Sequence, residues 1–473
     1  MDDFRKYMTE TINRHLIPGV GVIALRGEEV LLHEGFGLAD REKGTGVTPE
    51  TIFGIGSITK SFTALAIMQL QDAGRLNVQD RVTKYLPAFT STGRSDLTGI
   101  TLHHLLSNSS GLPPLPYLRN ALAKSVLADP SFELMGLKED QYANPVATAD
   151  EIVELITNSD VELLAEPGAI FSYCNDGWAL LGRIIELVSG NDYVEHVKAN
   201  ILEPLGMTRS TFDAGELAQM DDVTNLYSYI GGFDRVEPTP GWWEAPAMTA
   251  AGFLKSTTGD MARYARVFLG ETDLISAESL KLMVTPHIRT SAQRHYGYGL
   301  MIQEDYHGRK MVEHGGNIKG VAAYMTTFPD EKLIGVALAN ITGGPVGQMA
   351  LSALNVPLGL PLHTEREEYT ETGLDAEALA RLTGRYESEE NTVVDLFLND
   401  AGELQADLKS TVVTARPVSR DAVLVDLNGA DALIQYLDEG ENGFGQIFFG
   451  FRVLRRTGEG QVPGKDAEET LII

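Results

Sequence analysis

Ser57 and Lys60, three residues apart, are the side chains of this sequence best suited to chemistry. They stand in FGIGSITKSF, where a glycine-containing turn leads into an apolar segment. Positions i and i+3 share one face of a helix, so Lys60 would project beside Ser57. A serine hydroxyl is a weak nucleophile until a base takes its proton. A lysine whose pKa is lowered by burial or by a nearby positive group could be that base. We expect the Oγ atom of Ser57 within about 3.5 Å of the Nζ atom of Lys60.

The same pair also has a simpler interpretation, with Ser57 as a helix N-cap and Lys60 as a solvated side chain. Three observations favour chemistry. SITK is the single Ser-x-x-Lys of the chain, and no Gly-x-Ser-x-Gly offers another nucleophile. The helix expected over 61–76 is apolar nearly all round, which leaves Lys60 no easy path to solvent. Its amino end would also favour a developing oxyanion at Ser57.

The hydrophobic pattern predicts the elements that position this pair. Residues 2–16 indicate a helix, and residues 19–37 a β-hairpin. Helices and long loops follow, and KMVEHGG, VAAYMTTF and KLIGVALAN then predict three strands. Because strands open and close this segment, the sequence predicts an α+β, three-layer fold: an antiparallel sheet with a helical region inserted at about 57–290.

The pattern changes after Pro357 and Pro361. HTEREEYTETG is typical of a charged linker, and NTVVDLFLND and GELQADL alternate apolar with polar residues. We therefore predict one domain over 1–356, a linker over 357–374 and an all-β barrel domain over 375–473.

The composition limits the expected partners. The 66 acidic and 38 basic residues give a net charge of −28, which argues against nucleic acid or an anionic membrane. The chain has one cysteine and no apolar stretch of about 20 residues, and its first residues show no signal-peptide core. These features favour a reduced, cytoplasmic protein, and they leave assembly into homo-oligomers open. No zinc motif occurs, so we expect neither a metal nor a cofactor.

IFGIGSITKSFTALAIMQL resembles the nucleophile motif of the serine β-lactamase and penicillin-binding-protein superfamily. The resemblance is greatest to the branch of class C β-lactamases, D-Ala-D-Ala carboxypeptidases, D-aminopeptidases and esterases. ITLHHLLSNSSGLP, EPGAIFSYCNDGWALLGRIIELVSG, EPLGMTRSTF and AAGFLKSTTGDMARYARVF match in the expected order. The resemblance covers about residues 5–355 and implies an active site between a sheet and a helical region. The barrel is similar to the lipocalin-like domain appended to some serine peptidases of the family.

The family's second motif, Tyr-x-Asn, is matched by Tyr173-Cys174-Asn175. The resemblance implies that Tyr173 relays protons and that Asn175 orients Lys60 and the substrate amide. A phenol beside a lysine ammonium would lose its proton more easily. A second copy starts at Tyr142, but a proline follows it in a loop, whereas the first copy precedes an amphipathic helix.

The third motif is matched by His314-Gly315-Gly316, where the glycines would let a substrate backbone approach. By resemblance, the amide of Asn317 would join that of Ser57 in an oxyanion hole. The motif departs from the family's Lys-Thr-Gly, because histidine is mostly neutral at pH 7 and the hydroxyl is lost. Both changes weaken a site for a substrate carboxylate. His314 could restore that site by gaining a proton near pH 5–6.

The sequence thus predicts a metal-independent serine hydrolase, with Ser57, Lys60 and Tyr173 as catalytic residues. It would cleave small amides or peptides that contain D-amino acids, or esters, through an acyl-enzyme. Two alternatives stay open: a carboxylesterase or weak β-lactamase of the same fold, and a non-catalytic penicillin-binding or scaffold protein.

Overall fold

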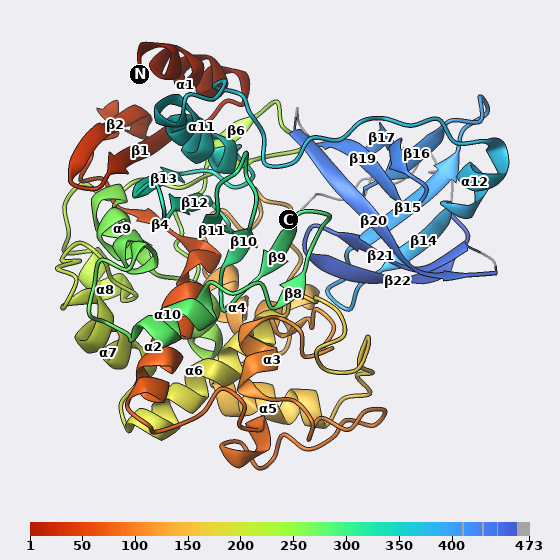
Figure 1. Ribbon diagram of the computed structural model, residues 1–473, viewed down its shortest axis with the longest axis horizontal. Coiled ribbons are helices and arrows are strands. Elements are labelled where there is room, and N and C mark those ends of the chain that lie inside the picture. Colours follow the sequence, from red (N-terminus) through yellow and green to blue (C-terminus); the bar gives the residue numbers. More distant parts are fainter. Residues whose placement is uncertain (409–410, 428–429, 442, 461–473) are drawn as a thin grey trace.

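The computed structural model describes residues 1–408, 411–427, 430–441 and 443–460 and contains two nine-stranded antiparallel sheets (Figure 1). The main sheet has the order β3-β2-β1-β13-β12-β11-β10-β9-β8. Its strands are β1 (Gly19–Arg26), β2 (Glu29–Asp40), β3 (Thr45–Gly46), β8 (Ile288–Arg289), β9 (Arg294–Tyr296), β10 (Met301–Gln303), β11 (Met311–Ile318), β12 (Val321–Phe328) and β13 (Leu333–Ala339).

The two ends of the α+β segment meet in this sheet, as predicted. β1 pairs with β2 in the expected hairpin and with β13 on its other side, where Val22 lies opposite Ala337. β8, β9 and β10, which the hydrophobic pattern does not predict, extend the sheet beyond β11. Each has only two or three residues, too few to show an alternating pattern.

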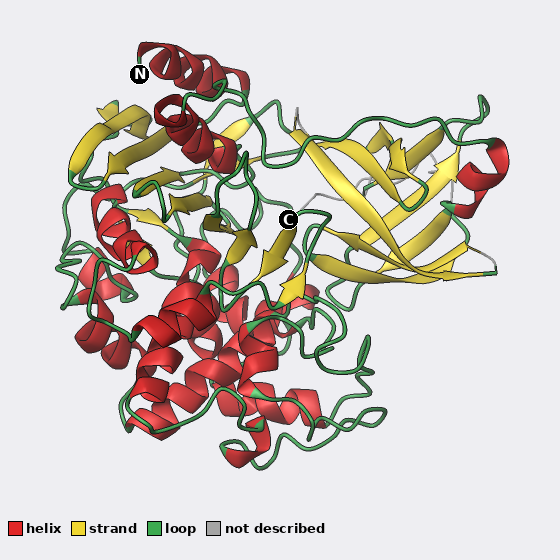
Figure 2. Ribbon diagram, viewed as in Figure 1, coloured by secondary structure: helices red, strands yellow, loops and turns green. Residues whose placement is uncertain are grey.

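Helices cover both faces of the main sheet (Figure 2). On one face, α1 (Asp2–Arg14) and α11 (Val346–Leu358) share an apolar core with β1 and β13. The other face carries the inserted helical region. Its helices are α2 (Thr59–Asp72), α3 (Leu102–Leu106), α4 (Tyr117–Leu127), α5 (Ala149–Thr157), α6 (Asn175–Ser189), α7 (Tyr193–Val197), α8 (Ala214–Leu217), α9 (Thr258–Ala265) and α10 (Ala277–Met283). This arrangement is the three-layer fold that the sequence predicts.

Helix α2 lies at the centre of the helical region, as its apolar sequence predicts. Every residue from Thr59 to Met68 is buried. Two small strand pairs lie outside the two large sheets: β4 (Phe53–Gly54) with β7 (Lys255–Ser256), and β5 (Tyr227–Tyr229) with β6 (Val236–Pro238). β4 ends shortly before Ser57, and its pairing with β7 joins the start of α2 to a segment much later in the chain.

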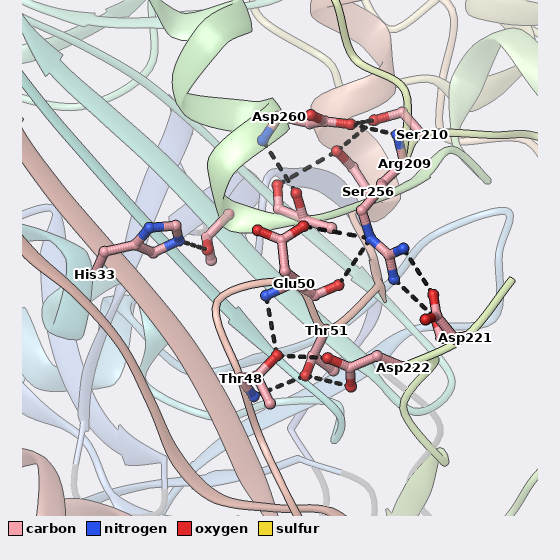
Figure 3. A network of polar contacts seen from close by, with 12 residues as sticks. His33, Thr48, Glu50, Thr51, Arg209, Ser210, Asp221, Asp222, Ser256 and Asp260 are labelled. Carbon is pink, nitrogen blue, oxygen red and sulfur yellow. Dashed lines mark hydrogen bonds and ion pairs between the residues drawn. The ribbon is translucent and has the colours of Figure 1, made fainter.

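A polar network holds the segment that leads into β4 (Figure 3). The Oγ1 atom of Thr51 donates to the Oδ1 atom of Asp222 at 2.7 Å. The guanidinium of Arg209 donates to the carbonyl oxygen of Glu50 at 3.1 Å and to Asp221 at 2.9 Å. These bonds tie the chain before Ser57 to the segment 209–222, which contains α8.

The second sheet forms a nearly closed barrel with its own core. Its order is β17-β16-β15-β14-β22-β21-β20-β19-β18. The elements are α12 (Ala376–Arg381), β14 (Gly384–Glu387), β15 (Val393–Leu398), β16 (Leu404–Asp407), β17 (Val412–Thr414), β18 (Arg416–Ser419), β19 (Ala422–Leu427), β20 (Ala430–Gly440), β21 (Gly443–Phe449) and β22 (Arg452–Gly458). Within the described residues the two sheets share no strand pairing, and the expected C-terminal barrel is confirmed.

The segment between the sheets is attached to the main sheet rather than free. Arg366 donates two hydrogen bonds of 2.9 Å to the carboxylate of Glu313 on β11, which also accepts one of 2.7 Å from Arg294. Glu313 is buried, and the two guanidinium groups hold its pKa below the usual range despite burial. No helix among the described residues is both long enough and apolar enough to cross a membrane.

Candidate active site

Ser57 and Lys60 lie together where the β4 turn becomes α2, and their expected proximity is confirmed. Ser57 belongs to a 3₁₀ turn, Gly56–Ile58, and α2 starts one residue later. The Nζ atom of Lys60 is 3.1 Å from the Oγ atom of Ser57. Ser57 does not cap α2 and Lys60 is 0% exposed, so the simpler interpretation of this pair is wrong.

The amine of Lys60 has three oxygen partners. Besides Ser57, it lies 2.9 Å from the Oδ1 atom of Asn175 and 2.6 Å from the carbonyl oxygen of Ala251. A neutral amine has two protons and one lone pair. It can donate to the amide and carbonyl oxygens and accept the hydroxyl proton of Ser57. Burial, and then the positive charge of Arg452, lower the pKa of Lys60 well below its usual range.

Two residues at the amino end of α6 lie beside this amine: Asn175, the first residue of the helix, and Tyr173, two residues before it. The Nζ atom of Lys60 lies 4.8 Å from the centroid of the Tyr173 ring. Burial raises the pKa of the Tyr173 phenol to about 12, although a hydrogen bond with Ser57 opposes the rise. The phenol is therefore protonated at neutral pH, and the expectation that it loses its proton easily is wrong. Tyr142, from the rival motif, packs against the ring of Phe132 instead.

Strand β11 runs directly against the turn that holds Ser57. A Cβ atom on Gly316 would lie 2.0 Å from the carbonyl oxygen of Ile55 and 2.8 Å from the amide nitrogen of Ser57. Gly56 has φ +50°, and a Cβ there would lie 2.9 Å from the amide nitrogen of Asn317. Both glycines are needed for this close approach. It brings the backbone amides of Ser57 and Asn317 together where β11 meets the Ser57 turn, a contact that we call the seam.

The other two residues of the third motif point to different surroundings. A Cβ on Gly315 would lie 2.8 Å from the ring of Tyr324, so packing accounts for this glycine. His314 is buried, with its Nδ1 atom 2.6 Å from the carbonyl oxygen of Gly315 and its Nε2 atom 2.9 Å from the hydroxyl of Tyr296. A carbonyl can only accept, so Nδ1 carries a proton, and in the neutral ring Nε2 then accepts from Tyr296.

Both ring nitrogens of His314 are hydrogen-bonded, and its surroundings favour the neutral ring. Burial, and then the charge of Lys60, lower its pKa to about 3. The expectation that His314 supplies a cation near pH 5–6 is wrong, because its surroundings favour the uncharged ring. No group of three or more His, Cys, Asp or Glu side chains in the described part of the chain is arranged to hold a metal ion.

Sequence reasoning missed the part of the site that comes from the barrel. Arg452 begins β22, and its Cζ atom lies 5.1 Å from the centroid of the Tyr173 ring. Phe451 lies 6.3 Å from the same ring, centroid to centroid. Nothing in the local pattern of 443–458 distinguishes this hairpin from the others of the barrel, so only the fold reveals its proximity to Tyr173.

Residues 4–355 match the family model described as Beta-lactamase. The chain belongs to this family. Penicillin-binding protein 4* of Bacillus subtilis (strain 168) is a relative of 25% identity over 408 residues, or 82% of this chain and 85% of that protein. Solved structures are also similar to this chain. The octameric penicillin-binding protein homologue from Pyrococcus abyssi has 29% identity and a TM-score of 0.68, covering 96% of this chain and 99% of its own.

A further solved structure is similar to a smaller share of this chain. The D-stereospecific amidohydrolase from Streptomyces sp. has 24% identity and a TM-score of 0.62. It covers 74% of this chain and 97% of its own length. The P. abyssi homologue, by contrast, is similar over nearly the whole chain, barrel included.

Proposed function

We propose that this chain is a serine hydrolase that cleaves small amides or peptides containing D-amino acids through an acyl-enzyme and requires no metal. The observation that carries the proposal is the buried Lys60 amine, 3.1 Å from Ser57 Oγ, with its other two close oxygens on Asn175 and Ala251. In its neutral form this amine directs its lone pair at the hydroxyl proton.

The proposed reaction starts with attack of Ser57 Oγ on the substrate carbonyl while Lys60 takes the hydroxyl proton. The amides of Ser57 and Asn317, brought to one seam by Gly56 and Gly316, stabilise the oxyanion. Tyr173, protonated at neutral pH, relays the proton from the Ser57–Lys60 pair to the leaving amine. Water then attacks the acyl-enzyme with Lys60 again as the base, and the free acid leaves Ser57.

The choice of substrate class rests on the third motif. Because His314 is neutral and Gly315 has no hydroxyl, β11 offers no cation for the carboxylate of a β-lactam. A neutral or cationic amide avoids this loss, and the fold shared with the D-stereospecific amidohydrolase agrees with that choice. The same observation favours small neutral esters as a second substrate class. By analogy with the octameric P. abyssi homologue, we also propose that the chain forms homo-oligomers.

The test is burst kinetics with p-nitrophenyl acetate and a set of D-aminoacyl p-nitroanilides, followed by mass spectrometry of the quenched enzyme. We expect a burst of about one equivalent of nitrophenol and an acyl group on the peptide that contains Ser57. Ser57→Ala should lose both, while Ser91→Ala, at an exposed serine, should keep both. Acylation of another serine in Ser57→Ala would contradict the proposal, and absence of any acylation would favour the non-catalytic alternative.

A further inference from the structure

Two turns of the C-terminal barrel contact the helical region, one at the segment that carries Tyr173 and the other at α4. One joins β21 to β22, where Phe449 pairs with Arg452 across a two-residue turn. Gly450 and Phe451 in that turn have φ values of 56° and 64°, as a type I′ hairpin requires. A phenylalanine is rarely found in this left-handed conformation. Here its ring lies at the tip of the hairpin, 6.3 Å from the ring of Tyr173 and 6.5 Å from that of Phe171.

The second turn, between β14 and β15, supplies the partner of Arg452. The Nε atom of Arg452 donates to the Oε2 atom of Glu390 at 2.7 Å. The backbone oxygen of Glu390 accepts from Arg119 of α4 at 3.4 Å, which attaches this turn to the helical region. The side chains of Arg452 and Glu390 are 22% and 19% exposed, so the ion pair is largely shielded from solvent. It is therefore a charge pair held in place, with little screening by water.

The ring of Tyr173 lies close to two basic side chains. Lys60 Nζ is 4.8 Å and Arg452 Cζ is 5.1 Å from its centroid. Because both distances are to one centroid, the amine nitrogen and the guanidinium carbon lie within 9.9 Å of each other. A guanidinium in that range opposes protonation of the amine, because like charges repel in a buried site. The guanidinium also packs on the aromatic face and so helps to fix the ring that the proposed reaction uses.

The titratable and charged groups that face Lys60 are Tyr173, Cys174 and Asp176 at the start of α6, His314 of β11, and Glu390 and Arg452 of the barrel. Burial shifts the pKa of each of the first four toward its uncharged form. The ion pair from the barrel is the charged feature in this set. Its two members act in opposite directions on the pKa of Lys60: Arg452 lowers it and Glu390 raises it.

We propose that Arg452, brought to Tyr173 by the β21–β22 hairpin and held by Glu390, is a positioning residue that keeps the Lys60 amine unprotonated and the Tyr173 ring in place. The barrel is then part of the active site rather than an appendage beside it. This inference rests on the proposed function, in which neutral Lys60 is the base.

The direct test is a pH titration of Lys60 by carbon-13 NMR of lysine Cε, which reports protonation without any turnover. Lys60→Arg assigns the resonance. We expect the Lys60 midpoint to move to higher pH in Arg452→Ala and to lower pH in Glu390→Gln. Arg452→Lys keeps the charge and should stay near the wild-type midpoint. Circular dichroism and the melting temperature of each variant check that it is folded.

The kinetic counterpart is the pH profile of kcat/KM for p-nitrophenyl acetate, a substrate without charge. On the acidic limb we expect Arg452→Ala to lose about 3- to 10-fold, which is a displacement of about half to one pH unit. The limb of Glu390→Gln should move the opposite way, and plateau rates should change less.

Opposite shifts of the two folded variants support the inference, because a loss of packing alone would not reverse its sign with the sign of the charge removed. An unchanged Lys60 midpoint in Arg452→Ala, or shifts in the same direction for both variants, would overturn it. Absence of acylation in the wild-type protein would instead refute the proposed function, while the NMR titration would still decide whether Arg452 controls Lys60.

Discussion

Lys60 and Asn175, 115 residues apart in the sequence, are joined by a 2.9 Å hydrogen bond between Nζ and Oδ1. The bond links the first turn of α2 to the first residue of α6. An amide oxygen accepts a hydrogen bond from the amine without adding a negative charge beside it. Asn175 can therefore fix the direction of the amine and leave Lys60 free to be neutral.

Asn175→Asp should preserve the shape of the site but reverse this electrostatic effect. A carboxylate beside Lys60 favours the ammonium form, so the acidic limb of kcat/KM should move to higher pH. At pH 7 we expect a loss of about 10- to 100-fold, partly recovered as the pH rises. The pH profile with a neutral ester measures the effect. Asn158→Asp makes the same change at an exposed position and should leave the profile unaltered.

Gly316→Ala should disable the seam between β11 and the Ser57 turn. The new Cβ would lie 2.0 Å from the backbone oxygen of Ile55, so one of the two backbones must move. We expect the free energy of unfolding to fall by about 1–3 kcal/mol, as for other overpacked sites. The loss in kcat/KM, expressed as a free energy, should be larger, because both amides of the seam shift. Urea unfolding and ester kinetics measure the two effects. Gly99→Ala, where a Cβ meets no atom within 4 Å, is the matched control.

Glu313→Gln should destabilise the protein, because it leaves the buried guanidinium groups of Arg294 and Arg366 without their counter-charge. Breaking a buried ion pair in this way costs about 3–5 kcal/mol. Glu237→Gln, which breaks a surface pair with Arg235, should cost about 0–1 kcal/mol. Chemical denaturation at pH 7 measures both variants.

The same carboxylate predicts a pH dependence of stability. The pKa of Glu313 is lowered in the folded protein, so its contribution is present above the unfolded-state pKa of about 4.3. It is lost as the pH falls through the lower folded-state pKa. The free energy of unfolding should fall more steeply below pH 4 in the wild type than in Glu313→Gln. Equal slopes would show that the two arginines do not lower the pKa of Glu313 in the folded protein.

Nitrocefin should be hydrolysed poorly, without a rise toward pH 5–6. The pKa of His314 is lowered to about 3, so the ring stays neutral over that range. One or two missing charge-assisted hydrogen bonds correspond to about one to four orders of magnitude in kcat/KM relative to a small neutral ester. Parallel rate measurements from pH 5 to 8 test this expectation. Nitrocefin turnover as efficient as that of the ester would mean that another residue, with Arg452 as the first candidate, supplies the cation.

The sequence by itself determined the features that depend on local spacing. The three-residue step from Ser57 to Lys60 and the apolar character of the following helix already predict a buried pair on one face, which the structure has. Alternating residues after Pro361 likewise predict a separate antiparallel sheet, because side-chain direction in a strand has a period of two. Neither feature requires knowledge of distant segments.

The tertiary structure alone decided the features that depend on segments far apart in the chain. Ala251, Glu390 and Arg452 reach the surroundings of Lys60 and Tyr173 through folding, and no spacing rule connects them to Ser57. The charge state of His314 was also beyond sequence reasoning. Its pKa is lowered by burial and then by the charge of Lys60, and the degree of desolvation is known only when the surrounding elements are in place.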